Sequence, residues 1–178
     1  MILKKNIIEG SYTIELDKKS DKRGFFARAY CKDILKEKQI VKKISQVNFS
    51  YSKNKGTVRG LHFQAKPYQE IKIIYCLKGK IFDVVVDLRK KSKTYGKYYG
   101  VVLSEKKRNG IIIPKGCAHG FQSLVDNTEI VYFSTEKYSS NHEKGIIYND
   151  KIINIKWPLK PTVISKKDSS WKDIAYYE

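Results

Sequence analysis

Three histidines are the first candidates for chemistry, because an imidazole ring can both accept and release a proton near neutral pH. His62 lies between apolar neighbours in the segment Arg59-Gly60-Leu61-His62-Phe63-Gln64, and His119 follows a Pro-Lys-Gly turn. On spacing alone, a single histidine among apolar residues is more typical of a packed side chain than of a catalytic base. The third, His142, lies in a polar stretch and is expected at the surface.

Lys72 is a further candidate, because it interrupts the apolar run from Ile71 to Tyr75. A buried ammonium group is costly unless something nearby requires its charge. The local sequence of Asp168 is by itself typical of a surface carboxylate near the end of the chain. Tyr132 and Tyr138 are two of 13 tyrosines, so composition alone assigns neither of them a role.

Strands must position these residues, because short β-branched and aromatic runs recur with turn residues between them. This spacing predicts an all-β barrel or sandwich. Alternate residues of 81–87 point to opposite sides, and we expect one face in the core and the other against a cavity or solvent. One short helix is predicted at 32–38. The predicted strands span residues 7–16, 43–51, 71–77, 80–88, 97–103, 110–113, 129–136 and 152–155.

Length and charge limit the class of protein. At roughly 150 residues per domain, a chain of 178 residues predicts a single domain, residues 1–178. The 36 Lys and Arg residues exceed the 18 Asp and Glu residues by 18, but the lysines are scattered through every turn. No nucleic-acid-binding motif accompanies them, so an anionic small molecule such as a nucleotide diphosphate suits the charge better than nucleic acid. No apolar run is long enough for a membrane span or signal peptide, and three widely spaced cysteines suit a reducing compartment, so we expect a cytoplasmic protein with no membrane partner.

The segment from Pro114 to His119 has the pattern Pro-x-Gly-x-x-His, which resembles the second sequence motif of cupins, small β-barrels that often hold a metal. Metal-binding cupins also supply a His-x-His pair and a glutamate from their first motif. Here that region offers only His62, followed by Phe63 and Gln64. Three good ligands are therefore not assembled, and we expect a barrel with no catalytic metal.

A more specific resemblance covers nearly the whole chain in order. The sequence is similar to the dTDP-4-dehydrorhamnose 3,5-epimerase family, metal-independent cupin-type enzymes that act on nucleotide-linked 4-keto sugars. Any one motif would be weak evidence, but many in register make membership a strong inference. The matching segments are Arg23-Gly24-Phe25-Phe26, Gln46 to Ser50, Arg59 to Gln64, Lys72, Gly79, Phe82 to Val84, Val86 to Arg89, Ser92 to Gly96, Pro114 to Phe121, Tyr132, Tyr138, Asn149-Asp150, Trp157-Pro158 and Ser165 to Asp168.

The resemblance implies a cupin-type jelly-roll β-barrel with a few short helices, and it assigns roles in catalysis. Epimerisation beside a ketone requires a base, a group that stabilises the enolate oxygen, and an acid on the opposite face. By resemblance, His62 is the base and Asp168 its carboxylate partner. Lys72 would lie by the developing oxyanion, and Tyr132 would be the acid. No redox or other cofactor is implied.

Substrate binding is assigned in the same way. Arginines suit bidentate contacts with a diphosphate, amides supply hydrogen bonds, and an aromatic face suits the nucleotide base. At position 28 the family usually has a glutamate near the base, whereas this chain has an arginine, and the identity of the base is therefore left open. The predicted binding residues are Arg23, Phe26, Arg28, Gln46, Asn48, Arg59, His119 (in the pocket wall) and Tyr138.

The function that follows is epimerisation of a nucleotide-linked 4-keto-6-deoxy sugar, with dTDP-4-dehydro-6-deoxyglucose as the expected substrate and deoxysugar for surface polysaccharide as the outcome. Family members are homodimers that exchange strands, so a homodimer is expected. The alternatives are a mono-epimerase acting at C3 or C5 only, an epimerase of a GDP- or CDP-linked sugar, and a ketoisomerase on a related barrel, which would not require Tyr132. A non-catalytic sugar-nucleotide-binding barrel would keep Arg23 and Arg59 but lose His62, Lys72 and Tyr132.

Overall fold

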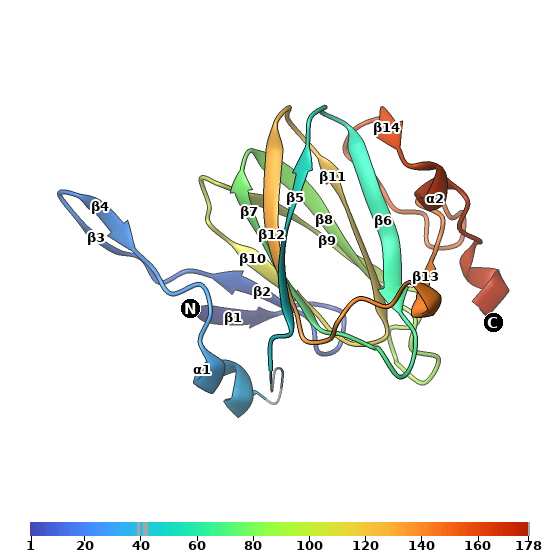
Figure 1. Ribbon diagram of the computed structural model, residues 1–178, viewed down its shortest axis with the longest axis horizontal. Helices are drawn as coiled ribbons and strands as arrows, with labels where there is room; N and C mark the ends of the chain where they lie inside the picture. Colours follow the sequence, from blue (N-terminus) through green and yellow to red (C-terminus); the bar gives the residue numbers. More distant parts are fainter. Residues whose placement is uncertain (39, 41–42, 178) are drawn as a thin grey trace.

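Two six-stranded sheets face each other in the computed structural model, which describes residues 1–38, 40 and 43–177 (Figure 1). Sheet one contains, in spatial order, β1 (Ile2–Lys5), β2 (Tyr12–Glu15), β10 (Gly110–Ile113), β7 (Lys72–Lys78), β12 (Thr128–Ser134) and β5 (Gln46–Ser52). Sheet two contains β13 (Glu143–Gly145), β6 (Thr57–Gln64), β11 (Cys117–Ser123), β8 (Lys80–Asp87) and β9 (Tyr98–Ser104), with β14 (Val163–Ile164) parallel to β6. Neighbouring strands such as β6 and β11 come from distant parts of the chain, as in a jelly roll. The predicted all-β jelly-roll barrel is confirmed.

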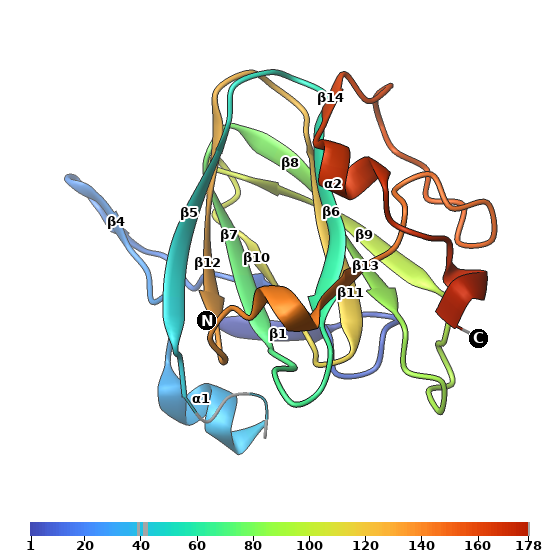
Figure 2. The same ribbon diagram turned by 45° about the vertical axis from the view of Figure 1, so that its right-hand side comes forward.

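The helical segments are short, as predicted. They are α1 (Lys32–Glu37), η1 (Ser140–His142), α2 (Lys166–Ser169) and η2 (Ile174–Tyr177). The helix predicted at 32–38 is confirmed as α1. The C-terminal segment, with α2 and β14, runs along the outside of β6 (Figure 2). None of the described helices is long and apolar enough to cross a membrane.

The core has an inner and an outer part. Between the sheets, Ile74 of β7 packs in one cluster with Ile81 and Val85 of β8. On the outer face of sheet two, Val84 and Val86 pack in another. For residues 81–87, which lie in β8, we expected one face to meet a cavity or solvent. This is wrong for the outer face of β8, because the C-terminal segment covers it.

The strand predicted at 7–16 is confirmed only for Tyr12–Glu15, which form β2, and the strand predicted at 152–155 is wrong. The apolar run at 152–155 is not a strand, because buried Asp150 bends it: the Asp150 Oδ1 atom accepts the N–H groups of Ile152 and Ile153, each at 2.8 Å. Ile153 then packs against the outside of sheet two. Conversely, β6 was not among the predicted strands, although it carries His62.

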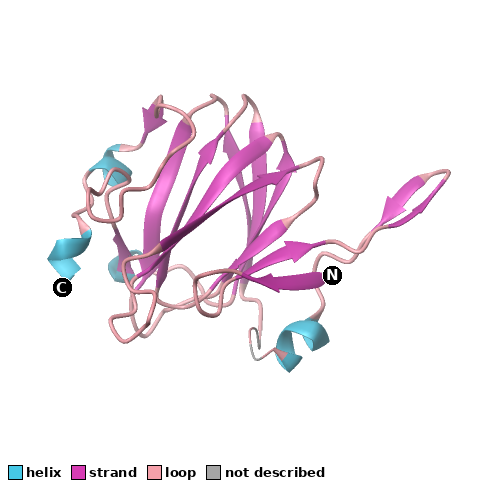
Figure 3. Ribbon diagram, turned by 180° about the vertical axis from the view of Figure 1, so that it is seen from behind, coloured by secondary structure: helices cyan, strands magenta, loops and turns pink. Residues whose placement is uncertain are grey.

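A two-stranded hairpin projects away from the barrel (Figures 1 and 3). It consists of β3 (Lys19–Asp21) and β4 (Gly24–Phe26), and its residues are exposed, Phe26 by 69%. Exposed apolar side chains also lie on β5, the last strand of sheet one, at Val47 and Phe49. A hairpin that carries apolar side chains into solvent is typical of a segment that packs against another molecule.

Candidate active site

Two adjoining cavities, of about 250 and 460 Å³, lie between the sheets. Strands β6 and β11 of sheet two and strands β5, β7 and β12 of sheet one contribute to the walls, and α2 closes one side. The two cavities share four lining residues, His62, Lys72, Tyr132 and Lys167. Residues predicted from separate motifs are thus brought to one place.

A bulge in β6 places two predicted residues on the same wall. Arg59 pairs with Phe121 and His62 pairs with His119, so two residues of β6 oppose the single residue Gly120 of β11. In a regular strand, the side chains of residues three apart point to opposite faces of the sheet. The extra residue of the bulge turns the side chains of Arg59 and His62 to the same face. Both Arg59 and His62 consequently line the smaller cavity.

Only glycine fits at position 60, inside this bulge. Its φ of +94° lies in the region that side-chain-bearing residues avoid, and an added Cβ atom would lie 2.4 Å from the carbonyl oxygen of His119. Gly60 therefore permits the close approach of β6 and β11 that brings two histidines together.

His62 is a half-buried histidine in positively charged surroundings. Burial, followed by the charges of Lys72, His119 and Lys167, lowers the pKa of His62 well below its ordinary value of 6.5. The imidazole is therefore neutral at pH 7. A neutral imidazole facing a cavity can accept a proton from a bound molecule.

Hydrogen bonds at the start of α2 and to β6 fix the position of Asp168. The Ser165 hydroxyl caps α2 and accepts the Asp168 N–H at 3.0 Å, and the Asp168 carboxylate accepts the Gly60 N–H at 3.2 Å. Both Asp168 and His62 line the smaller cavity. Among the described residues, however, no hydrogen bond joins the Asp168 carboxylate to the His62 ring.

Lys72 is buried, in agreement with its position in an apolar run. Its exposure is 8%, and it is the only buried lysine or arginine among the residues that the structure describes. The Lys72 Nζ atom lies 3.1 Å from the Glu70 carboxylate. A buried ammonium group that borders both cavities can stabilise negative charge that develops on a bound molecule.

Tyr132 lies on β12, next to β7. Burial raises the pKa of its phenol, and the negative charges of Glu70 and Glu143 raise it further. The Tyr132 hydroxyl therefore keeps its proton at neutral pH and can act as a proton donor.

His119 forms a His–carboxylate pair in the wall of the smaller cavity. Its Nε2 atom lies 2.9 Å from Asp83 Oδ2, and Asp83 is fully buried. Burial raises the pKa of Asp83, while His119 opposes that shift. The pair fixes the orientation of the His119 ring on β11, where His119 is paired with His62 of β6.

The remaining predicted binding residues divide into two groups. Gln46, Asn48 and Tyr138 line the larger cavity, where Gln46 Oε1 accepts the Tyr138 N–H at 2.7 Å. By contrast, the three residues of the projecting hairpin and its continuation lie outside both cavities. These are Arg23, which pairs with Asp21 at 2.6 Å, Phe26 and Arg28.

Sequence reasoning missed several residues of the larger cavity. Lys167 directly precedes Asp168, and Glu70 lies two residues before Lys72, so proximity to predicted residues was the available signal. Glu143 pairs with Lys167 and accepts a hydrogen bond from the Tyr138 hydroxyl, but its local sequence carries no comparable signal.

A metal site is not evident within 1–38, 40 and 43–177, where no three His, Cys, Asp or Glu residues are grouped suitably. Gln64 lies in the region where metal-binding cupins have ligands, but its side chain forms hydrogen bonds with backbone groups. Its Nε2 atom donates to Tyr68 O and Lys137 O, and its Oε1 atom accepts the Ser139 N–H. The amide of Gln64 thus joins β6 to two neighbouring loops.

Comparison with known proteins gives a consistent result. The family model described as dTDP-4-dehydrorhamnose 3,5-epimerase matches residues 5–175. The Shigella flexneri enzyme of that name is 43% identical over 149 residues, covering 83% of this chain and 82% of its own. The structure of the Bacillus anthracis enzyme with TDP and PPi bound has a TM-score of 0.93 at 37% identity, covering 97% of this chain and 98% of its own. The Legionella pneumophila dTDP-6-deoxy-D-glucose-3,5-epimerase, in complex with dTDP-4-keto-L-rhamnose, has a TM-score of 0.93 at 35% identity, covering 99% and 94%.

Proposed function

The chain belongs to the dTDP-4-dehydrorhamnose 3,5-epimerase family, and we propose that its two cavities bind a dTDP-linked 4-keto-6-deoxy sugar and invert C3 and C5. The observation that carries this proposal is that His62, Lys72 and Tyr132, which come from three different strands, line both cavities. These three groups supply a base, a cation for the oxyanion and an acid.

The proposed reaction moves one proton at each carbon in turn. His62 removes the proton from the carbon beside the C4 ketone, and the electron pair of that C–H bond moves to the carbonyl oxygen. The resulting enolate is stabilised by the Lys72 ammonium. Tyr132 then returns its phenolic proton to the same carbon from the opposite face, and exchange with water restores both residues before the second carbon reacts.

The surroundings of these groups support the assignments. The neutral state of His62 suits a base, and the protonated state of Tyr132 suits an acid. Asp168 lines the same cavity as His62, and its carboxylate would stabilise the imidazolium that forms when His62 accepts a proton. Arg59 enters the smaller cavity from β6 and is the cation best placed for the diphosphate.

Labelling in heavy water tests the proposal. The protein is incubated with dTDP- and GDP-linked 4-keto-6-deoxy sugars, and NMR identifies the carbons that take up deuterium. Uptake at both C3 and C5 of the dTDP sugar is expected. Uptake at one carbon would indicate a mono-epimerase, preference for the GDP sugar would change the base, and binding without uptake would indicate a non-catalytic barrel.

The pH dependence should reflect the lowered pKa of His62. Only the neutral ring can act as the base, so the group limits activity only when the pH falls through its pKa. We therefore expect kcat/KM to be retained between pH 7 and 6 and to be lost at a pH well below 6.5. An acid limb centred above pH 6.5 in the kcat/KM profile would contradict the assignment of His62 as the base.

We further propose a homodimer in which the hairpin of one protomer completes the cavity of the other. The support is that Arg23, Phe26 and Arg28 lie outside their own protomer's cavities, while Phe26 is exposed.

Both sheets contribute residues to the cavities, which supports treating residues 1–178 as a single epimerase domain. The three cysteines are free, which supports a location of the protein in the reducing environment of the cytoplasm.

Mixed dimers test the exchange of hairpins. His62→Ala and Arg23→Glu variants are each expected to have little activity, because one lacks the base and the other repels the diphosphate. If Arg23 acts on the partner, each heterodimer contains one intact site, and random mixing of subunits restores about a quarter of wild-type activity. Activity is measured after the two variants are mixed, partly unfolded and refolded together. No recovery, with heterodimers verified by mass spectrometry, would place Arg23 in its own protomer's site.

A further inference from the structure

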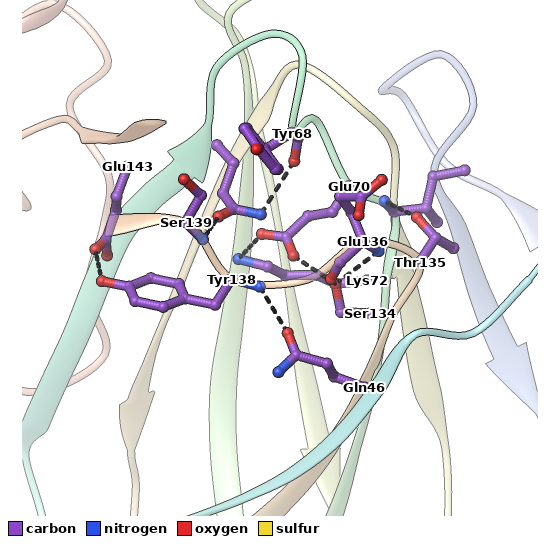
Figure 4. A network of polar contacts seen from close by, with 12 residues as sticks. Gln46, Tyr68, Glu70, Lys72, Ser134, Thr135, Glu136, Tyr138, Ser139 and Glu143 are labelled. Carbon is purple, nitrogen blue, oxygen red and sulfur yellow. Dashed lines mark hydrogen bonds and ion pairs between the residues drawn. The ribbon is translucent and has the colours of Figure 1, made fainter. Parts of the chain in front are cut away.

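Lys72 and Glu70 form an ion pair whose members are both largely inaccessible to water. Their side chains are 10% and 11% exposed, and the Nζ–Oε1 distance is 3.1 Å (Figure 4). Lys72 opens β7, and Glu70 lies two residues before it. A buried ammonium group without a partner is strongly destabilising, so the carboxylate has at least a role in folding.

A second contact fixes the carboxylate from the neighbouring strand. The Ser134 hydroxyl donates to Glu70 Oε2 at 2.5 Å, while Oε1 faces Lys72. Ser134 is 2% exposed and is the residue of β12 that pairs directly with Lys72. Its single proton has a second acceptor, Glu136 O at 2.8 Å, but the charged and closer oxygen of Glu70 is the stronger one. With one oxygen held from each strand, the carboxylate has little rotational freedom.

The pair is oriented with respect to the two cavities. Lys72 lines both of them, whereas Glu70 and Ser134 line only the larger one. The smaller cavity also contains His62 and Tyr132, so the ammonium borders the proposed reacting groups and the carboxylate does not. An ammonium group has three N–H donors, and the bond to Glu70 leaves two for a bound molecule.

From this arrangement we propose that Glu70, anchored by Ser134, is a positioning residue that holds the Lys72 ammonium at the site of the enolate oxygen. The inference rests on the proposed function, because it assumes that Lys72 stabilises the enolate. Pre-alignment matters because a lysine side chain has many rotamers, and a displacement of the order of 1 Å at a catalytic group can cost about 100-fold in rate.

Glu70 also acts on the acid of the proposed reaction. Tyr132 lies two residues before Ser134 on β12 and therefore on the same face. The charge of Glu70 is the second largest cause, after burial, that raises the pKa of the Tyr132 phenol. The same carboxylate thus orients the cation and favours the protonated form of the acid.

Two variants separate positioning from a purely structural role. Glu70→Gln removes the charge at nearly constant volume, and Ser134→Ala removes one of the two anchors while leaving both charges in place. The matched control is Glu136→Gln, which makes the same chemical change at a carboxylate that accepts the Lys137 N–H and lines neither cavity. For each variant we would measure kcat, KM, deuterium uptake at C3 and C5, and the melting temperature.

We expect Glu70→Gln to lower kcat by about tenfold or more, with KM changed by less than about threefold, because the cations proposed for the diphosphate are untouched. Deuterium uptake should slow by the same factor at both carbons, because both reactions pass through an enolate on the same oxygen. Ser134→Ala should show a smaller loss of the same pattern. The control should match the wild type.

A carboxylate that only neutralised a buried lysine would change the melting temperature and leave kcat unchanged. A kcat of Glu70→Gln within about twofold of wild type, or a loss confined to KM, would overturn the inference. If Glu70→Gln does not fold, an unchanged kcat of Ser134→Ala overturns it equally. Absence of uptake by the wild type with the dTDP sugar would refute the proposed function and this inference together, whereas an active wild type with an equally active Glu70→Gln refutes only the inference.

Discussion

Replacement of His62 with alanine is expected to abolish the exchange of substrate hydrogen for deuterium at C3 and at C5, with the rate falling by about 10²- to 10⁴-fold. His62 supplies a neutral imidazole to the smaller cavity, and alanine offers no atom that could accept the proton. The loss should appear in kcat, since the groups proposed to hold the diphosphate remain. Deuterium uptake followed by NMR is the direct measurement.

The control for this variant is His142→Ala. A hydrogen bond of 2.8 Å joins His142 Nδ1 to the Ser139 hydroxyl, and the ring of His142 packs against Tyr68, outside both cavities. Its replacement should leave the uptake of deuterium near the wild-type rate. Retained exchange at both carbons in His62→Ala would rule out His62 as the base, and retained exchange at one carbon would require a second base for it.

The strands that sequence patterns predicted well are buried apolar runs bounded by turn residues. β7 and β8 are short apolar runs separated by Lys78-Gly79, and the structure places them within one residue of the predicted bounds at 71–77 and 80–88. Their apolar side chains pack in the core because both faces of β8 are covered. Local pattern was sufficient where a strand is regular and buried.

β6 escaped prediction for a physical reason. Its middle contains Gly60, which is rare in strands, and its alternation is broken by the bulge opposite Gly120. The bulge exists only in the pairing of β6 with β11, and such pairing between distant segments is not encoded in local periodicity. The strand that carries the proposed base was therefore the hardest one to find from pattern.

The error at residues 152–155 has a related cause. The isoleucine-rich run there resembles a strand, but the preceding Asn149-Asp150 is a turn signal, and the Asp150 side chain holds the following backbone. Asp150 also accepts the N–H of Ile174 at 2.6 Å, which ties the segment to the C-terminal η2. Apolar side chains here cover a sheet without joining it.

The site was predictable only through family resemblance. Composition and spacing favoured packed histidines, a surface aspartate and undistinguished tyrosines, whereas the structure brings His62, Tyr132 and Asp168 to one cavity. Lys72 was the exception, because an ammonium group within an apolar run is unusual in itself. Ser134 was missed because its relation to Lys72 depends on the register of β7 and β12.

Tyr132→Phe is expected to separate the two halves of the proposed reaction. Phenylalanine keeps the ring but removes the proton donor, so His62 can still take the proton and return a solvent deuteron to the same face. We expect inversion to slow by about 100-fold or more, while deuterium uptake with retained configuration slows by less than about tenfold. NMR of the sugar recovered from heavy water distinguishes labelled starting sugar from labelled epimer.

Tyr99→Phe is the matched control, because it removes a hydroxyl from a tyrosine that packs against the core between the sheets and lies outside both cavities. This variant should invert substrate at the wild-type rate. The physical basis of the Tyr132 prediction is its position, since it brings a protonated phenol to the same two cavities that His62 lines. Equal losses of uptake and inversion in Tyr132→Phe would show instead that the hydroxyl assists proton removal, and the acid on the far face would have to be another group.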